Sequence, residues 1–255
     1  VDDGLERDVH RALFHHPNTG PFISRQLIQR LVTSNPSPGY VYRVAQIFAN
    51  NGSGARGDLG AVVRAILLDY EARTLQAAGN LTYGKLKEPL LRTSALFRAF
   101  KATSNTKRLP INNSNGQISQ MAGSAPTVFN FFEPAYVQPG PLAAAGLFAP
   151  EFQIFTDTTA ITVPNYFNTY LTTAKPTNLD SDTVFLDFTD ALPLAANPVA
   201  LVDQMNLSLA GGTLSTAAKT RIVSAITSMP AATSATDKVR GAAYLVMTSP
   251  EAAIQ

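Results

Sequence analysis

The chain of 255 residues contains no cysteine, and this absence excludes disulfides, thiolate metal sites and cysteine nucleophiles. Tryptophan is also absent, and only 15% of the residues are charged, against about a quarter in an average globular protein. Ser, Thr, Asn, Ala and Pro take the place of the missing charge. Because polar but uncharged surfaces are more common in secreted proteins, we expect a secreted, periplasmic or extracellular location.

Long apolar runs are missing as well. No stretch approaches the roughly 18 apolar residues of a transmembrane helix, so no membrane span is expected. The first residue is Val1 and no signal peptide is present, which leads us to expect a processed or proteolysed amino terminus. A chain of this length suits one large domain or two small ones.

The charge is unevenly distributed along the chain. Residues 1–108 carry a net charge of +7, and residues 109–255 carry −5. One interpretation is a basic surface for an anionic partner, such as acidic polysaccharide or nucleic acid. The other is that the two halves neutralise each other. The basic residues stand singly among apolar ones, which favours the second interpretation, and nucleic acid ranks last because no recognition motif occurs.

Helical periodicity dominates the first hundred residues. Leu5, Val9 and Leu13 fall on one face of a predicted helix over residues 5–15. Apolar stripes with the same spacing recur in four later segments, which are 21–34, 39–50, 58–73 and 86–102. Turns rich in Pro, Asn and Gly separate these segments, so the sequence predicts an all-helical array over residues 1–102.

Polar residues at the helix starts predict caps. Thr19 or Asn18 is expected to cap the second helix, the Ser34–Pro38 stretch the third, and Asp58 the fourth.

The remainder is less regular. Residues 103–156 are rich first in Ser, Asn and Gly and then in Pro and Phe, which predicts a loop followed by short helical turns whose aromatic side chains pack on the array. Four helices are predicted in residues 157–255, and only 184–188 alternates like a strand. The predicted fold is mainly α: a multi-helix array with a long irregular segment and little or no β. The third part, 157–255, is expected to form one continuous domain with 1–102.

Histidine residues and one polar loop are the candidate metal sites of the sequence. His10 and His15 are five residues apart and do not share a helix face, so we expect no metal there; His16 is expected to end the helix with its ring on a carbonyl. In the loop NNGSGARGD, Asn51, Ser53 and Asp58 are spaced somewhat like calcium ligands. The first position of that pattern lacks an acid and the twelfth is Gly, so a structural corner is the preferred interpretation. No metal and no cofactor is predicted.

Three arginines are the candidate ligand-binding residues, because a guanidinium can grip a carboxylate or phosphate through two parallel hydrogen bonds. They are Arg25, Arg56 and Arg92. The alternative is that the basic side chains of this region pair between helices with Asp58, Asp69, Glu71 and Glu88, and we favour it.

Catalytic signatures are sparse. Neither a nucleophile elbow nor a phosphate-binding glycine loop occurs. Glu88 and Glu133 stand in apolar surroundings, where burial raises the pKa of a carboxyl group, and they are the only acid/base candidates. Each has the alternative role of a salt-bridge partner.

The sequence resembles one known family along almost its whole length. The resemblance rests on long literal phrases: HHPNTGPFISRQLIQRLVTSNPSPGYVYRVAQIFANNGSGARGDLGAVVRAILLDYEAR, GKLKEPLLR, APTVFNFFEPAYVQPGP, APEFQI and VRGAAYLVMTSPE. They are similar to the bacterial family catalogued as domain of unknown function 1800. The resemblance implies no activity and no catalytic residues. It implies a bacterial protein with an export signal, of which residues 1–255 resemble the carboxyl-terminal half.

These observations favour a structural or assembly role for an exported protein, or association with an extracellular polymer. The expected partners are the missing amino-terminal half or a second subunit, further copies of the chain, or an acidic polysaccharide. The alternative is a cell-envelope enzyme that acts on polysaccharide or another polymer.

Overall fold

The computed structural model describes residues 3–74, 82–111, 114–128 and 130–254. These residues form twelve α-helices and three short 3-10 helices, and they contain no β-strand beyond three isolated bridges. The prediction of a mainly α fold is therefore confirmed. None of the described helices is long and apolar enough to cross a membrane.

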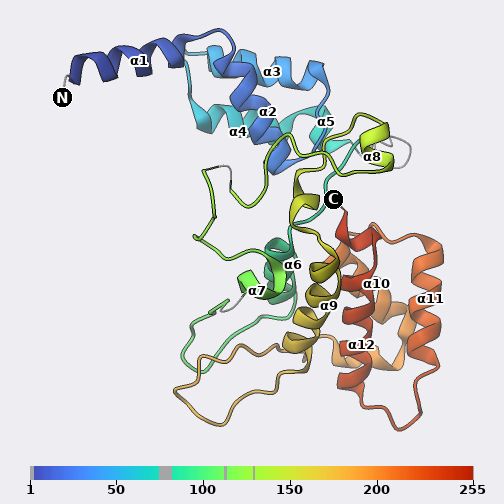
Figure 1. Cartoon of the computed structure of the whole chain (residues 1–255). Coiled ribbons are helices and arrows are strands. Elements are labelled where there is room, and N and C mark those ends of the chain that lie inside the picture. Colours follow the sequence, from blue (N-terminus) through green and yellow to red (C-terminus); the bar gives the residue numbers. More distant parts are fainter. Residues whose placement is uncertain (1–2, 75–81, 112–113, 129, 255) are drawn as a thin grey trace. The chain divides into compact units, whose positions relative to one another are not determined.

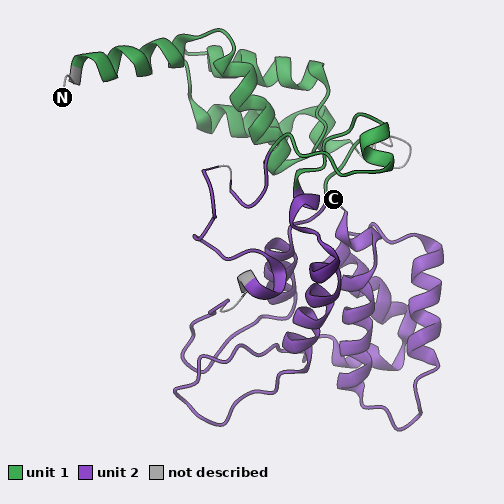
Figure 2. Cartoon of the chain, in the orientation of Figure 1, with its two compact units in different colours: residues 1–85, 134–150, 255 green, residues 86–133, 151–254 purple. Residues whose placement is uncertain are grey.

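The chain divides into two compact units (Figure 2). The first comprises residues 1–85, 134–150 and 255, and the second comprises 86–133 and 151–254. This grouping places the predicted helix at 86–102 in the second unit. The division into 1–102, 103–156 and 157–255, with the outer parts continuous, stays a prediction.

The described residues of the first unit form six helices (Figure 1). They are α1 (Asp3–His15), α2 (Thr19–Leu31), α3 (Pro38–Ala49), α4 (Leu59–Leu68), α5 (Tyr70–Arg73) and α8 (Pro141–Ala144). The apolar stripes of α2, α3 and α4 meet in one small core, whose buried members are Ile28, Val32, Tyr40, Val44, Phe48, Val62 and Ile66. No residue of α1 belongs to that core.

The caps of these helices follow the sequence only in part. Ser37 accepts a hydrogen bond from the backbone N–H of Tyr40, and Asp58 accepts one from that of Ala61, so the predicted caps of α3 and α4 are confirmed. The predicted cap of α2 is wrong. Asn18 holds the N-cap position without a side-chain hydrogen bond, and the Thr19 hydroxyl donates to the Leu13 carbonyl at the end of α1.

The second unit contains α6 (Pro89–Ala99), α7 (Ser114–Ile118), α9 (Asp157–Thr172), α10 (Pro198–Ala210), α11 (Thr216–Thr227) and α12 (Ala235–Thr248), with the 3-10 helices η3 (Leu192–Ala196) and η4 (Glu251–Ala253). The remaining 3-10 helix, η2, spans Pro150–Ile154. A single large core joins α6, α9, α10 and α12; its fully buried members include Leu96, Phe167, Leu201 and Val246. The predicted carboxyl-terminal helices are confirmed.

The alternating segment at 184–188 does not form a strand. Val184, Leu186 and Phe188 are buried, as their alternation indicates. Phe185 pairs with Thr103 through two backbone hydrogen bonds of 2.9 and 3.1 Å, and Asp187 adds one bond to the Phe100 carbonyl at 2.9 Å. These few backbone hydrogen bonds do not make a sheet. The alternation arises because one side of an extended loop is buried.

The aromatic side chains of the irregular segment have mixed environments. Phe132 is buried, whereas Phe155 is 38% exposed. Tyr136 is half-buried, and Tyr166, which follows in α9, is buried.

Glycine is required at one turn of the corner between α3 and α4. Gly57 adopts φ +76°, and a Cβ atom there would lie 2.6 Å from ring atoms of Phe14. Its backbone N–H donates to the Phe48 carbonyl at 2.8 Å. The corner therefore fixes the end of α1 against α3.

We predict that Gly57→Ala destabilises the first unit by about 1–3 kcal/mol, because it combines left-handed backbone strain with a contact on Phe14. Gly54→Ala is the matched control, since Gly54 has φ +87° with no atom within 4 Å of its Cβ position. Urea denaturation followed by circular dichroism measures both variants. Equal losses of stability would show that the Phe14 contact is unimportant.

Candidate functional site

A groove on the first unit collects the most distinctive residues of the sequence. It has a volume of about 810 Å³ and runs between α2 and α3, with the turn at 17–18 and the corner at 49–56 at its rim. Its lining is mainly apolar, with four prolines, Phe22, Val41 and Tyr42, and it also includes Arg25 and Arg56. The Phe22 and Tyr42 side chains are 55% and 65% exposed. Apolar concave surfaces with a few polar groups are the usual form of binding sites.

Two of the three predicted ligand-binding arginines therefore line one groove. The Arg25 guanidinium lies 4.7 Å from the centre of the Phe148 ring, and in the described part of the chain it forms no salt bridge. Arg56 is already engaged: it donates to the carbonyls of Phe14 at 3.1 Å and His16 at 3.3 Å. Arg25 is thus the groove cation that remains available to a ligand.

Arg92 lies outside this groove, in the second unit. Its guanidinium donates to the Met247 carbonyl and lies 4.9 Å from the centre of the Phe167 ring. Burial lowers the pKa of Arg92 to about 10. This arginine therefore serves the packing of α6, α9 and α12.

The groove leaves out the carboxylates predicted as acid/base candidates. Glu88 is half-buried and accepts a hydrogen bond from Gln120 at 2.7 Å. Glu133 is exposed, so its predicted apolar surroundings are absent; its backbone N–H donates to Gln153. Neither residue lines the groove, so the structure does not bring a carboxylate pair to it.

The loop with calcium-like spacing satisfies its own polar atoms. The Asn51 amide donates to Asp58 at 2.8 Å, and the Asn51 side-chain oxygen accepts hydrogen bonds from Ser53 and from the backbone N–H of Ala55. The second oxygen of Asp58 caps α4. These contacts lower the pKa of Asp58, chiefly through the Ala61 N–H, and they favour the structural interpretation of the corner.

The predicted role of His16 is wrong in detail. Its ring nitrogen Nδ1 accepts a hydrogen bond from the Asn18 backbone N–H at 3.2 Å, instead of binding a carbonyl. The carbonyls at the end of α1 are taken by Arg56 and Thr19, and the cation is favourably placed at a helix carboxyl terminus.

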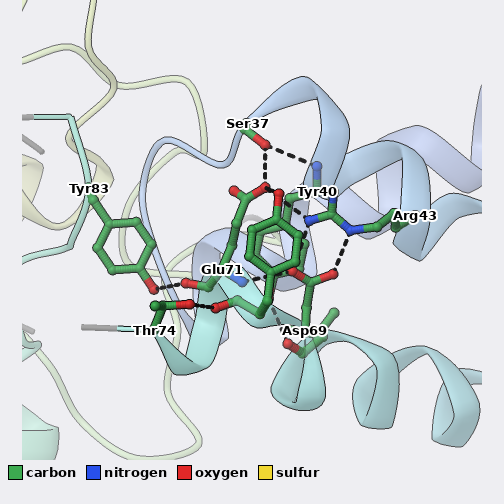
Figure 3. A network of polar contacts seen from close by, with 9 residues as sticks. Ser37, Tyr40, Arg43, Asp69, Glu71, Thr74 and Tyr83 are labelled. Atoms are coloured by element: carbon green, nitrogen blue, oxygen red, sulfur yellow. Dashed lines mark hydrogen bonds and ion pairs between the residues drawn. The ribbon is translucent and has the colours of Figure 1, made fainter. Parts of the chain in front are cut away.

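An ion-pair network joins α3, α4 and α5 (Figure 3). The Arg43 guanidinium donates twice to Asp69, with both distances 2.8 Å, and once to Glu71 at 2.9 Å. Ser37 donates to the same Glu71 oxygen at 2.7 Å, and the Tyr83 hydroxyl donates to the Glu71 carbonyl. Pairing of this basic region with Asp69 and Glu71 is thereby confirmed. We call this network, which connects α3 to the α4–α5 region, the clamp.

Helix α1 is the least covered element of the first unit. Leu5, Val9 and Leu13 form one face and are 66%, 49% and 62% exposed. At the carboxyl end of the helix, the Phe14 ring lies 6.0 Å from that of Phe48. An isolated helix shorter than about 12–15 residues is only marginally stable in water, so burial of this exposed apolar face would stabilise α1.

The comparisons with known proteins give a family but no activity. The family described as "Protein of unknown function (DUF1800)" matches residues 4–254. The chain belongs to this family. No curated protein and no solved structure matches it. That this DUF1800 chain is a carboxyl-terminal half stays a prediction.

We predict that Arg43→Gln loosens the clamp. It leaves Asp69, whose side chain is 8% exposed, without its ionic partner, at a cost of about 1–3 kcal/mol. Arg64→Gln on α4 is the matched control, since the Arg64 side chain is exposed. Hydrogen exchange of peptides from α3 to α5 should accelerate in Arg43→Gln alone. Identical exchange in both variants would contradict a stabilising clamp.

A pH dependence follows from Asp69. Burial alone raises the pKa of this carboxyl, but hydrogen bonds from Arg43 and from the Glu71 N–H outweigh it and leave the pKa below its usual value. The ion pair therefore contributes stability that is complete above the unfolded pKa of about 3.9 and is lost as the pH falls further. In urea titrations, the stability gap between the native chain and Asp69→Asn should be largest at pH 7 and narrow towards pH 3. A gap that is constant with pH refutes the assignment.

Proposed function

We propose that this chain is an exported bacterial structural protein that self-associates, with α1 of one copy docked in the α2–α3 groove of another. The uncovered apolar face of α1 is the observation that carries this proposal. Leu5, Val9 and Leu13 are largely exposed, so this apolar face does not contribute to the core of its own unit.

Charge complementarity favours a second copy as the occupant of the groove. On a helical wheel, Glu6 and Asp8 lie on either side of the Leu5–Val9–Leu13 face. The groove is likewise apolar, and it offers Arg25, which has no salt bridge within the described residues, at its edge. An apolar stripe with acidic edges thus matches an apolar groove with a basic edge.

The position of α1 makes the exchange reciprocal. Pro17 and Asn18, which are separated from the end of α1 only by His16, line the groove themselves. Helix α1 ends beside the groove of its own copy and can therefore dock in the groove of a symmetry-related copy. The α1 helix of that second copy then docks in the groove of the first. This is the self-complementary geometry of a two-fold dimer.

A membrane surface is a poorer partner for α1. Helices that lie on membranes carry an excess of Lys and Arg on their polar face. Residues 4–15 contain two acidic residues, Glu6 and Asp8, against two arginines, Arg7 and Arg11. That balance gives no attraction to anionic lipid and suits pairing between protein surfaces.

We predict that the chain forms dimers as its concentration is raised to about 100 μM. Leu5→Gln/Leu13→Gln should raise the dimer Kd roughly 30-fold, because it removes about 2 kcal/mol of apolar burial from the interface. Leu179→Gln/Leu207→Gln is the control, because these leucines of the second unit are also highly exposed, at 80% and 68%. Size-exclusion chromatography with light scattering gives the masses. A monomeric native chain, or equal association of both double variants, would falsify the proposal.

The groove side is tested by charge. Arg25→Glu should weaken association by repelling the acidic edges of α1, and mixing it with a Glu6→Arg/Asp8→Arg chain should restore heterodimers. If the Arg25→Glu chain associates as strongly as the native chain, the groove is not the docking site of α1. Release of the dimer by polygalacturonate, an acidic polysaccharide, would show that polymer and helix compete for Arg25.

A further inference from the structure

The second unit contains a separate cavity with a different chemical character. It has a volume of about 420 Å³ and is bounded by α9, by the extended segment around 182–184, and by Pro110 and Gln117. In contrast to the apolar groove of the first unit, its lining is rich in hydroxyl, amide and carboxylate groups: Tyr166, Tyr170, Thr169, Thr173, Thr183 and Asp182. Helix α7, which carries Gln117, packs against α9 (Figure 1).

Two tyrosine hydroxyls meet at this cavity. Tyr166 and Tyr170 are one turn apart on α9, and their hydroxyl oxygens are 3.1 Å apart. One phenol proton is used between them, so the other is left to donate outward. Burial, aided by the hydrogen bond to Tyr170, raises the pKa of Tyr166, which keeps this phenol neutral and able to donate.

The tyrosine rings are rigidly held. The Tyr170 ring makes edge contacts with the rings of Phe97 and Tyr166, at centroid distances of 4.8 and 5.1 Å. Tyr166 is 3% exposed. Because the rings are fixed before any ligand arrives, binding does not have to immobilise them.

Acceptors face the same space. Asp182 accepts a hydrogen bond from Thr106 and lies 3.9 Å from the Arg108 guanidinium, which leaves lone pairs of its carboxylate available. The Thr183 hydroxyl oxygen accepts from Ser181 at 3.0 Å, so its own proton is directed elsewhere. The cavity therefore presents donors and acceptors together, supplied by the tyrosine pair, Thr183 and Asp182.

The charge of the lining selects the ligand class. Asp182 is the one ionisable acid that lines the cavity, and the described lining contains no Lys, Arg or His. The charge of Asp182 is paired with Arg108, so the described lining offers an anionic ligand no cation to bind, whereas a neutral polyol both donates and accepts hydrogen bonds at each hydroxyl. Pro110 and the half-buried ring of Tyr170 add apolar surface on which a sugar ring packs.

We propose that this cavity of the second unit binds a neutral sugar residue, as a free oligosaccharide or as one unit of a polysaccharide, held by the Tyr166–Tyr170 hydroxyl pair and Asp182. The site is independent of the proposed dimer groove, which lies on the first unit. It would give the protein a carbohydrate attachment point in addition to self-association.

Affinity electrophoresis of the full chain in gels containing neutral polysaccharides (dextran, galactan, mannan, xylan, cellulose ether) or polygalacturonate tests the proposal. Retardation by a neutral polysaccharide is expected, and Tyr170→Phe should weaken it roughly three- to tenfold through loss of one hydrogen-bonding group. Tyr244→Phe on α12, which does not line the cavity, is the matched control and should bind as the native chain does.

Further variants keep the test decisive. If Tyr170→Phe fails to fold by circular dichroism, Thr183→Val in the exposed part of the rim replaces it. Leu5→Gln/Leu13→Gln should retain sugar binding, so failure of the dimer and failure of this site are distinguishable. Retardation by polygalacturonate alone, by none of the polymers, or equally in Tyr170→Phe and Tyr244→Phe overturns the assignment.

Discussion

The first unit depends on the burial of one small apolar core between α2, α3 and α4. Ile28, Tyr40 and Ile66 are fully buried there, and the Tyr40 hydroxyl donates to the Ile66 carbonyl at 2.7 Å, so even its polar atom is satisfied. The buried members of this core come from α2, α3 and α4 and from Val32 directly after α2, and none comes from α1. The consequence is that α1, although amphipathic, leaves Leu5 and Val9 facing solvent.

Arginines, more than acids, organise the surface around that core. Arg43 clamps α3 to the α4–α5 region through carboxylates, whereas Arg56 binds the carbonyls that end α1. Only Arg25 combines a groove position with an uncommitted charge within the described residues. Arg43 and Arg56 therefore have structural roles, whereas Arg25 is free to bind a partner. Because basic residues of the amino-terminal region are used in internal contacts, its net charge of +7 is no evidence for nucleic-acid binding.

Local patterns predicted the helices and the Asp58 cap, because both depend on neighbours within a few residues. The α2 cap was missed because Thr19 bonds backward to Leu13, a choice set by the packing of two helices. The sequence predicted Arg25 and Arg56 as ligand-binding candidates, but it did not predict that both line the same groove. The helical spacing around Tyr166 does not show whether this residue lies in the core or lines a cavity. The cavity is formed only when an extended segment about 16 residues further along the chain packs beside α9.

A partner for α1 is the central requirement of the proposed dimer. Hydrogen exchange of the α1 amides, measured on the native chain across a wide range of protein concentrations, tests this most directly. We expect protection of residues 5–13 to rise with concentration, in step with the dimer fraction, while the buried helix α3 is protected throughout. Exchange from α1 that is equally slow, or equally fast, at every concentration would contradict the account.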